Sequence, residues 1–444
     1  MANIQSFLLI APILALLTQF LKHPNTPSLV QKHFPQLCAS PKGMEILQQF
    51  QLSRLCTMQV DPHKQLMIPG PVEVHEDVLS AAGGLSMSHV DPVFVNQFGE
   101  ALELLRKVFV TESGQPFIVS ASGTLGWDMV AVNLVEPGED VLVLNTGFFG
   151  DRFAEALEVY GARTTHVRAP VGKRPSLAAI QAALDEKPYK MVTITHVDTS
   201  TGVLMPVEAI SKMVKAKNPN TLVVVDGVCS IGGETLLFDA WSVDVAMTAS
   251  QKALGAPPGL SIMMASQHAM TVFNERKAPI PSYYGSWRKW LPIMKAYEAR
   301  TPAYFATPAV QLIQALGVSL KQILMQTPDI TDRFAKHEAV SDHVKRVVAS
   351  WGLGMVTATE EAAHTMTGVY LPEGMALAQL LPKISAKGVV VAGGLHPEIS
   401  TKYFRIGHMG VSVMEEHRAH IDNVLKVVKA ALGEAGYTFP QDAL

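Results

Sequence analysis

The sequence predicts an α/β protein with a seven-stranded, mainly parallel sheet in a large domain, followed by a smaller C-terminal αβ domain. From residue 117 to residue 265, short apolar runs alternate with helical stretches, which is typical of a parallel sheet covered by helices. Most of these runs are continuous and β-branched, as in strands that are buried on both faces. After residue 311 the pattern changes to long helices and a short mixed segment.

The elements of the large domain follow one another from about Leu66. Strands are predicted at residues 117–121, 140–145, 164–169, 190–197, 221–226, 243–249 and 260–265. Helices are predicted between them at residues 124–135, 152–160, 177–184 and 207–216. In sheets with this alternation, ligands bind beyond the carboxyl ends of the strands.

The smaller domain is predicted from the elements that follow. Helices are expected at residues 311–326 and 329–350, strands near 367–371, 388–392 and 403–406, and a final helix at about 415–432. We therefore divide the chain into an N-terminal extension, a large domain and a small domain, at residues 1–60, 61–326 and 327–444.

The N-terminal extension differs in composition from the rest. Its apolar run at residues 7–21 is broken by Pro12 and is shorter than the roughly 20 residues of a membrane span. A secretory signal requires a basic residue before its apolar run, and none precedes this one. No acidic residue occurs before Glu45. Three interpretations stay open: a targeting segment, an anchor, or an extension before a mature protein that begins near Met58.

The composition limits the partners, disulfides and metal sites that we expect. The 444 residues are 48% hydrophobic and 17% charged, with a net charge of −3, so neither nucleic acid nor an anionic membrane is indicated as a partner. The three cysteines, Cys38, Cys56 and Cys229, are too widely spaced for a disulfide framework or a zinc site. We expect no metal, and a reducing, intracellular setting.

A lysine, Lys252, follows the strand predicted at residues 243–249. The segment that contains it ends at Gly255 and at Pro257-Pro258-Gly259, so it cannot continue as regular structure. Considered alone, Lys252 is either a surface lysine in a turn or an amine nucleophile that forms a Schiff base. Burial and nearby cations lower the pKa of a lysine and prepare it for that chemistry.

Other strand ends also carry polar or small residues. Ser122-Gly123-Thr124 precedes a helix, where backbone N–H groups and the helix dipole form a phosphate cradle, or where Ser122 and Gly123 merely cap the helix. Phe149 lies between two glycines and either stacks on a flat ligand or packs in the core. Residues 198–202 form a polar loop. Asp226 ends a buried strand, so it needs a partner, such as a protonated ring nitrogen, a helix N-terminus or a cation.

These residues lie at one edge of one predicted sheet. Lys252 would meet an aldehyde, Asp226 a pyridine nitrogen, and the amides near Gly123 a phosphate. Pyridoxal phosphate requires this combination. The separation of Asp226 and Lys252 is roughly one strand–helix–strand unit, which places both at the same edge. We therefore predict a pyridoxal phosphate site with Lys252 as the Schiff-base lysine.

The motifs resemble those of the class V, fold type I pyridoxal-phosphate-dependent aminotransferases. The resemblance is greatest to the alanine–glyoxylate (serine–pyruvate) aminotransferase family in its fungal form, and it covers about residues 65–435. The matching segments are residues 69–71, 120–124, 195–204, 225–230, 250–253, 307–308 and 404–407.

The resemblance implies roles for individual residues. Lys252 would bond to the cofactor and then move a proton, while Asp226 would keep the pyridine nitrogen protonated. Thr199 would lie near the phenolic oxygen, and Val228 and Phe149 would cover the two faces of the ring. The phosphate would be held by Ser122, Gly123, Thr124 and Gln251.

Further residues match the family's substrate and subunit contacts. Arg405 corresponds to the arginine that grips the substrate carboxylate in a bidentate fork. Tyr304 and Thr307 correspond to residues that reach the partner's phosphate across a homodimer interface. His196 and Cys229 we interpret as structural. Three aromatic residues either shape the substrate entrance or pack in the core: Trp287, Trp290 and Tyr297.

The resemblance implies transamination of glyoxylate to glycine, with alanine or serine as the amino donor. Alternatives are a serine–pyruvate or serine–glyoxylate aminotransferase, a lyase such as a cysteine desulfurase, and an inactive scaffold. A desulfurase needs a nucleophilic cysteine in the C-terminal half, and no cysteine follows Cys229. Intact Lys252, Asp226 and Arg405 argue against a scaffold. The family implies a peroxisome or a mitochondrion; the C-terminal Leu444 lacks the preceding basic residue of a Ser-Lys-Leu address.

Overall fold

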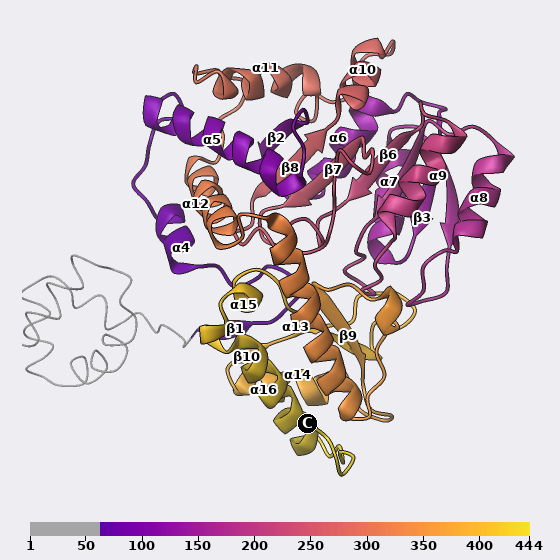
Figure 1. The fold of residues 1–444 in the computed structure, drawn as a ribbon, viewed down its shortest axis with the longest axis vertical. Helices are drawn as coiled ribbons and strands as arrows, with labels where there is room; N and C mark the ends of the chain where they lie inside the picture. Colours follow the sequence, from indigo (N-terminus) through magenta and orange to yellow (C-terminus); the bar gives the residue numbers. More distant parts are fainter. Residues whose placement is uncertain (1–62) are drawn as a thin grey trace, which may run out of the picture. The chain divides into compact units, whose positions relative to one another are not determined.

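The computed structural model describes residues 63–444, of which Lys64–Leu444 form one compact unit (Figure 1). The predictions for the N-terminal extension, including its apolar run, Cys38, Cys56 and Met58, lie outside the described residues. Within residues 63–444, no helix is both long enough and apolar enough to cross a membrane.

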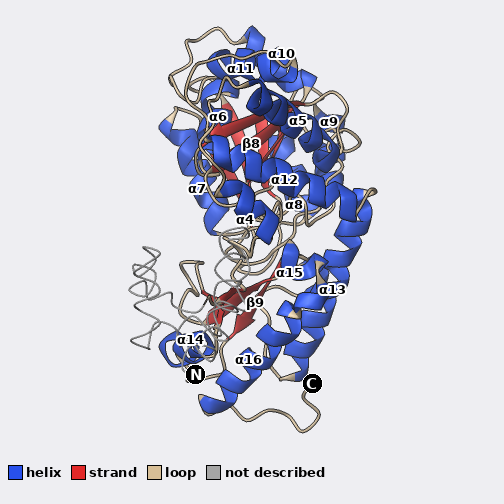
Figure 2. Ribbon diagram, turned by 90° about the vertical axis from the view of Figure 1, so that its left-hand side faces the viewer, coloured by secondary structure: helices blue, strands red, loops and turns tan. Residues whose placement is uncertain are grey.

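A seven-stranded sheet, here called the central sheet, forms the middle layer of the large region (Figure 2). Its spatial order is β2-β8-β7-β6-β5-β3-β4. The strands are β2 (Gln115–Ser120), β3 (Asp140–Asn145), β4 (Arg163–Arg168), β5 (Met191–Thr195), β6 (Leu222–Asp226), β7 (Val245–Ala249) and β8 (Leu260–Ala265). In this sheet β8 alone runs against the others, so the predicted mainly parallel sheet is confirmed.

Three neighbouring strands, β5, β6 and β7, are buried along their whole length. Their apolar, largely β-branched side chains fit a sheet with helices on both faces. The register pairs Thr195 of β5 with Asp226 of β6, and Asp226 with Met247 of β7. Asp226 therefore stands at the carboxyl edge of the sheet, between two parallel strands.

Helices cover both faces of the central sheet (Figures 1 and 2). The helices of this region are α4 (Glu76–Ala82), α5 (Pro92–Phe109), α6 (Leu125–Leu134), α7 (Phe148–Val159), α8 (Leu177–Glu186), α9 (Val207–Lys217), α10 (Gln267–Glu275), α11 (Trp287–Glu298) and α12 (Val310–Gln326). Helix α7 begins at Phe148, four residues before the predicted start. The reason is a cap from outside the helix: the Ser200 hydroxyl and the Asp198 carboxylate accept its first backbone N–H groups.

The long helix α13 (Ile330–Ser350) leads into a C-terminal region (Figure 1). Its elements are β9 (Met366–Tyr370), α14 (Leu377–Ala386), β10 (Val389–Val390), β11 (Ala392–Gly393), β12 (Tyr403–Gly407), α15 (Val411–Met414) and α16 (His420–Glu434). Strands β11, β12 and β9 form an antiparallel sheet, and β10 pairs with β1 (Gln65–Leu66). The strand predicted at residues 388–392 is thus two short strands with different partners.

The predicted final helix is present as α16, but it begins at His420, five residues after the predicted start at about residue 415. Ala419 has a left-handed backbone, with φ of 51°, which an α-helix cannot include, and a 3₁₀ turn (Glu416–Arg418) precedes it. The central sheet and the C-terminal sheet each have their own hydrophobic core. The domain boundary predicted after residue 326 stays a prediction.

A third, small apolar cluster joins these two regions. It includes Val72, Val197 and Cys229 from the large region with Met366 and Met409 from the C-terminal region. Val197 and Cys229 follow the carboxyl ends of β5 and β6. The cluster therefore holds the C-terminal region against the sheet edge at which the predicted site lies.

Candidate active site

Lys252 lies just beyond β7 and is buried, with 8% of its surface exposed. Its Nζ donates a hydrogen bond to the backbone carbonyl of Pro69. Gly70 lies so close that a Cβ at this position would be 2.9 Å from Nζ, and its φ of +118° also favours glycine. The interpretation of Lys252 as a surface lysine is therefore wrong, and the segment around Gly70 is shaped to receive its amine.

Asp226 is buried at the carboxyl end of β6, with 3% of its surface exposed. Its Oδ1 accepts a hydrogen bond from the backbone N–H of Val228 at 3.0 Å, and its Oδ2 accepts one from Trp127 Nε1 at 2.9 Å. Burial raises the pKa of Asp226 to about 6, although both hydrogen bonds favour the charged form. A buried acid of this kind is stabilised by a cationic ligand.

Three charged groups from different elements share this region. Burial lowers the pKa of Lys252; the positive charge of Arg405 lowers it further, and the negative charge of Asp226 acts in the opposite direction. An amine with a lowered pKa is more often neutral at physiological pH, as a nucleophile or a base must be.

The predicted phosphate cradle is a tight turn at the start of α6. Backbone N–H groups of Leu125 and Gly126 bond to the carbonyls of Ser122 and Gly123, at 3.1 and 2.9 Å. The N-cap residue Thr124 makes no side-chain capping hydrogen bond. A Cβ on Gly123 would lie 2.9 Å from Ala249 Cβ, so only glycine fits between β2 and the end of β7. The arrangement leaves a helix N-terminus open to an anion.

Phe149 is held by the polar loop that follows β5. The Asp198 carboxylate accepts hydrogen bonds from the backbone of Phe149 at 3.2 Å and of Ser200 at 2.9 Å. It also accepts one from Ser200 Oγ at 2.6 Å. The Phe149 ring is half-buried, 6.4 Å from the Trp127 ring between centroids. The loop thus fixes the first turn of α7, which carries the predicted stacking residue.

Arg405 of β12 reaches back to this same loop. Its Nη1 donates to the carbonyl of Thr199 at 2.9 Å, and its Nε donates to the carbonyl of Gly393 at 2.8 Å. Tyr403, two residues earlier in β12, donates to the carbonyl of Ser200. Among the described residues no hydrogen bond uses Nη2 of Arg405, so the guanidinium keeps donors for a carboxylate.

Two predicted residues lie apart from this group. Tyr304 is 65% exposed, and its ring lies 5.3 Å from the ring of His89. Thr307 is also exposed, in the loop before α12. Both are on the surface of the single chain, where a second molecule would have access to them.

The aromatic residues of α11 belong to the core. Trp287, Trp290 and Tyr297 are at most 2% exposed, and Trp287 stacks on Phe117 with 5.1 Å between ring centroids. They do not line a substrate entrance. His196 is buried as well, and burial lowers its pKa to about 4, as expected for a neutral structural histidine.

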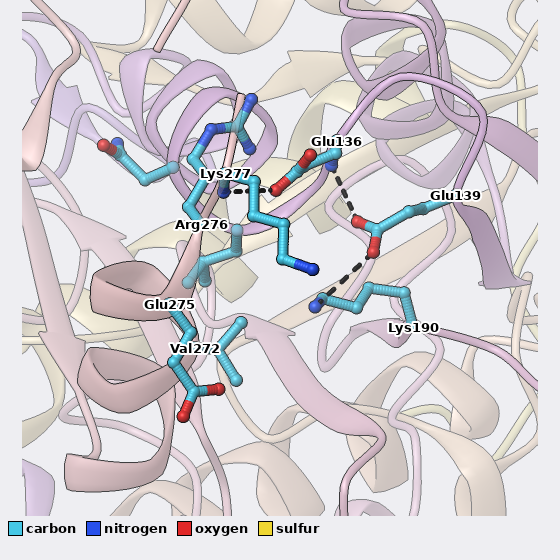
Figure 3. A pocket seen from close by; sticks show the side chains of 9 residues that line it. Glu136, Glu139, Lys190, Val272, Glu275, Arg276 and Lys277 are labelled. Atoms are coloured by element: carbon cyan, nitrogen blue, oxygen red, sulfur yellow. Dashed lines mark hydrogen bonds and ion pairs between the residues drawn. The ribbon is translucent and has the colours of Figure 1, made fainter. Parts of the chain in front are cut away.

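A cavity of about 570 Å³ lies at the opposite edge of the central sheet (Figure 3). Glu136 and Glu139 precede β3, and Lys190 precedes β5, so the cavity is at the amino ends of these strands. Lys190 Nζ lies 3.5 Å from a carboxylate oxygen of Glu139, and the Glu136 carboxylate accepts the backbone N–H of Lys277 at 2.8 Å. The cavity contains no residue of the predicted site.

Sequence reasoning missed two residues that organise the site, Trp127 and Asp198. Trp127 lies three residues after Thr124, one turn into α6, but its contact with Asp226 joins residues far apart in the chain. The sequence predicts Asp198 only as part of a polar loop. The pattern of Asp198 followed by Ser200, typical of an Asx turn, could have suggested that its side chain bonds to the backbone.

The geometry of the site defines the class of proteins to which this chain belongs. A seven-stranded α/β sheet with a buried lysine beyond one strand and a buried acid at the end of the neighbouring strand is the architecture of fold type I pyridoxal phosphate enzymes. Comparison with protein families then identifies the family. Residues 73–418 match the family Aminotransferase class-V, and the chain belongs to it.

Individual relatives agree with this membership. The chain is 41% identical over 380 residues to alanine–glyoxylate aminotransferase 1 of Saccharomyces cerevisiae, covering 83% of this chain and 97% of that protein. It is 31% identical to L-aspartate–glyoxylate aminotransferase of Paracoccus denitrificans, covering 78% and 86% of the two chains. A crystal structure of alanine–glyoxylate aminotransferase from Nostoc sp. superimposes with a TM-score of 0.77 at 28% identity, covering 85% and 98%.

Proposed function

We propose that this aminotransferase transfers the amino group of alanine or serine to glyoxylate, which becomes glycine, and that it uses pyridoxal phosphate. The observation that carries the proposal is the arrangement of Lys252, Asp226 and Arg405 at one edge of the central sheet. It unites a buried amine, a buried acid and a guanidinium that would bind a carboxylate. The yeast relative, named for the same reaction, supports the choice of substrates.

The residues present fit pyridoxal phosphate. The Gln251 Oε1 is buried and has no hydrogen-bond partner among the described residues. Gln251 lies next to Lys252 in the chain, where its side-chain amide nitrogen Nε2 would donate a hydrogen bond to the cofactor phosphate. The close approach at Gly123 and the N-terminus of α6 provide the cradle, with Ser122 and Thr124 beside it. Phe149 and Val228 would cover the ring, and Thr199 would bond to it.

When bound, the cofactor would supply an electron sink for the charge that develops on the substrate Cα. The neutral amine of Lys252 would take the proton from the Cα of the amino donor and, in the second half of the reaction, would give a proton to the Cα of the new glycine. Asp226, as a carboxylate, would hold a proton on the ring nitrogen. Arg405 would bind the substrate carboxylate and orient Cα toward Lys252.

A second copy of the chain would complete the site. Tyr304 packs against the ring of His89, and two apolar side chains that follow His89 near the start of α5, Val90 and Val93, are 45% and 54% exposed. Exposed apolar groups of this kind mark interaction surfaces. In the proposed homodimer, Tyr304 and Thr307 would contact the cofactor phosphate of the partner.

A lyase function has less support. A desulfurase mechanism needs an accessible thiolate, and Cys229 is buried with 1% of its surface exposed. Thr365 lies against it, with its hydroxyl bonded to the Cys229 carbonyl at 2.8 Å. Cys229 is therefore better interpreted as a packing residue.

An amino-donor assay tests the proposal. The purified chain, loaded with pyridoxal phosphate, is given glyoxylate with alanine, serine or aspartate, and glycine formation is measured. Alanine or serine should give at least tenfold higher kcat/KM than aspartate. Preference for aspartate, or activity only with a keto acid larger than glyoxylate, would overturn the substrate assignment.

The compartment stays a prediction, a peroxisome or a mitochondrion. A tagged full-length chain can be localised beside a chain that starts at Met58. Loss of organelle localisation in the shorter chain would assign targeting to the leading segment. Identical localisation of both would show that this segment is not the address.

A further inference from the structure

Helix α13 carries a buried polar stripe on the face that packs against the rest of the molecule. The stripe consists of residues four apart, Arg333, His337, Ser341 and Lys345, each at most 3% exposed. Residues four apart lie on one face of a helix, and a face that is buried against the rest of the protein is normally apolar. All four side chains instead bond to backbone groups of other segments. Buried polar groups that bond to loops specify where those loops lie.

Arg333 joins the two loops that carry the reactive groups. Its Nε donates to the carbonyl of Gly232 at 2.7 Å, and its Nη2 donates to the carbonyl of Ala253 at 3.0 Å. Ala253 follows Lys252 directly, and Gly232 lies in the turn after Asp226. Burial lowers the pKa of Arg333 to about 10, so the guanidinium stays charged at neutral pH. A buried charge held by two carbonyls makes strong hydrogen bonds and is costly to misplace.

His337, one turn later, joins α13 to the strand of the substrate arginine. Its Nε2 lies 3.2 Å from the backbone N–H of Gly410 and must be an acceptor there. Its Nδ1 therefore carries the proton, which is donated to the carbonyl of Arg333 at 2.8 Å. Burial lowers the pKa of His337 to about 3, so the neutral ring is maintained. Gly410 lies just beyond β12, which carries Arg405.

We infer that Arg333 and His337 are positioning residues. They fix the position of the Lys252 loop relative to the strand that carries Arg405. The inference rests on the proposed function, since it assigns roles to Lys252 and Arg405 in one reaction. The substrate carboxylate would be fixed by Arg405 while its Cα must stand within reach of Lys252 Nζ. The distance between these two groups is therefore decisive, and a shift of about 1 Å can lower the rate roughly 100-fold.

Two pairs of variants test this role. Arg333→Met removes both carbonyl bonds at similar side-chain length, and Arg333→Lys keeps the charge with fewer donors. His337→Phe removes both ring bonds, and His337→Gln keeps an acceptor for Gly410. The matched control is Arg346→Met, which changes an exposed arginine of the same helix. If Arg333→Met or His337→Phe does not fold, the milder variants Arg333→Lys and His337→Gln are measured in their place.

Hydrogen exchange of the full-length, cofactor-free protein is the first readout, because it does not depend on turnover. Arg333→Met should accelerate exchange at least tenfold in residues 229–234 and 250–256. His337→Phe should do so in residues 408–412, and Arg346→Met should change none of these segments. Unchanged exchange in the folded Arg333 and His337 variants would overturn the inference, whatever the cofactor content of the protein.

Kinetics and absorbance of the cofactor-loaded protein are the second readout. Arg333→Met should lower kcat/KM roughly 10-fold to 100-fold. It should also shift the pH midpoint of the cofactor absorbance, with Arg333→Lys between it and the wild type. If these values match those of the wild type, the inference is wrong but the proposed function stands. If the wild type binds no cofactor, the proposed function fails, and the exchange data decide the positioning role alone.

Discussion

Trp127 donates a hydrogen bond from its Nε1 to the Oδ2 of Asp226 across 2.9 Å, in a buried site. The backbone N–H of Val228 donates to Oδ1 of the same carboxylate, so the two hydrogen bonds together fix the plane of the carboxylate. Removal of this donor by Trp127→Phe should therefore raise the pKa of Asp226 further. A hydrogen bond to a charged group contributes about 1.5–3 kcal/mol, so cofactor affinity should fall roughly 10-fold to 100-fold.

The affinity is measured by titration of the cofactor-free protein with pyridoxal phosphate. Trp241→Phe, at a half-buried tryptophan elsewhere in the large region, serves as the control. Equal affinities for Trp127→Phe and the wild type would show that the indole does not support the acid.

The raised pKa of Asp226 predicts a pH-dependent stability. In the unfolded chain this pKa is about 3.9, whereas burial raises it to about 6 in the folded protein. Protonated Asp226 thus contributes stability that is fully present below about pH 4 and is lost as the pH rises through about 6. Asp226→Asn does not titrate. The free energy of unfolding of the wild type minus that of Asp226→Asn should fall on the order of 2–3 kcal/mol between pH 4 and pH 7.

Urea denaturation of both cofactor-free proteins, at a series of pH values, measures this difference. A difference that stays constant across the range, or increases with pH, would contradict the assigned environment of Asp226.

Arg405 should determine the affinity for substrates. Its Nε and Nη1 are anchored to the carbonyls of Gly393 and Thr199, so the guanidinium is already oriented. Loss of one partner of a buried charged pair costs about 2–4 kcal/mol, so Arg405→Gln should lower kcat/KM roughly 30-fold to 1000-fold. Cofactor absorbance should persist. Arg152→Gln, at an exposed arginine of α7, is the control, and similar kcat/KM values for the two variants would refute the role.

The exposed Tyr304 should stabilise the proposed homodimer. Tyrosine is enriched among residues that dominate protein interfaces, so Tyr304→Ala should raise the dimer dissociation constant at least tenfold. Sedimentation at several protein concentrations measures this constant. Val159→Ala removes another exposed apolar side chain, 73% exposed on α7, and should leave it unchanged. A monomeric wild type, or a dimer unaffected by Tyr304→Ala, would contradict the proposed interface.

The sequence predicted most of the central sheet because its strands are short, buried and strongly β-branched. The strands at residues 140–145 and 260–265 were predicted to the residue. The positions of Lys252 and Asp226 followed from a topological rule, since parallel strands bring their carboxyl ends to one edge. These predictions needed only the local pattern and the chain direction.

The contacts that shape the site could not be predicted in the same way, because they join residues far apart in the chain. The early start of α7 depends on Asp198 and Ser200, about fifty residues later. The partner of Asp226 is Trp127, and Lys252 bonds to Pro69. The helix and strand propensities of neighbouring residues do not predict such contacts. The delayed start of α16 follows a 3₁₀ turn (Glu416–Arg418) and the left-handed Ala419.

The central claim is that Lys252 holds pyridoxal phosphate, and absorbance spectroscopy of the purified full-length protein tests it most directly. The wild type, after incubation with the cofactor and removal of the excess, should retain about one cofactor per chain with a visible absorbance band that borohydride fixes to Lys252. Lys321→Ala, at an exposed lysine paired with Glu100, should behave as the wild type, and Lys252→Ala should lose the band. A wild type without bound cofactor, or a Lys252→Ala variant with an unchanged band, would contradict the claim.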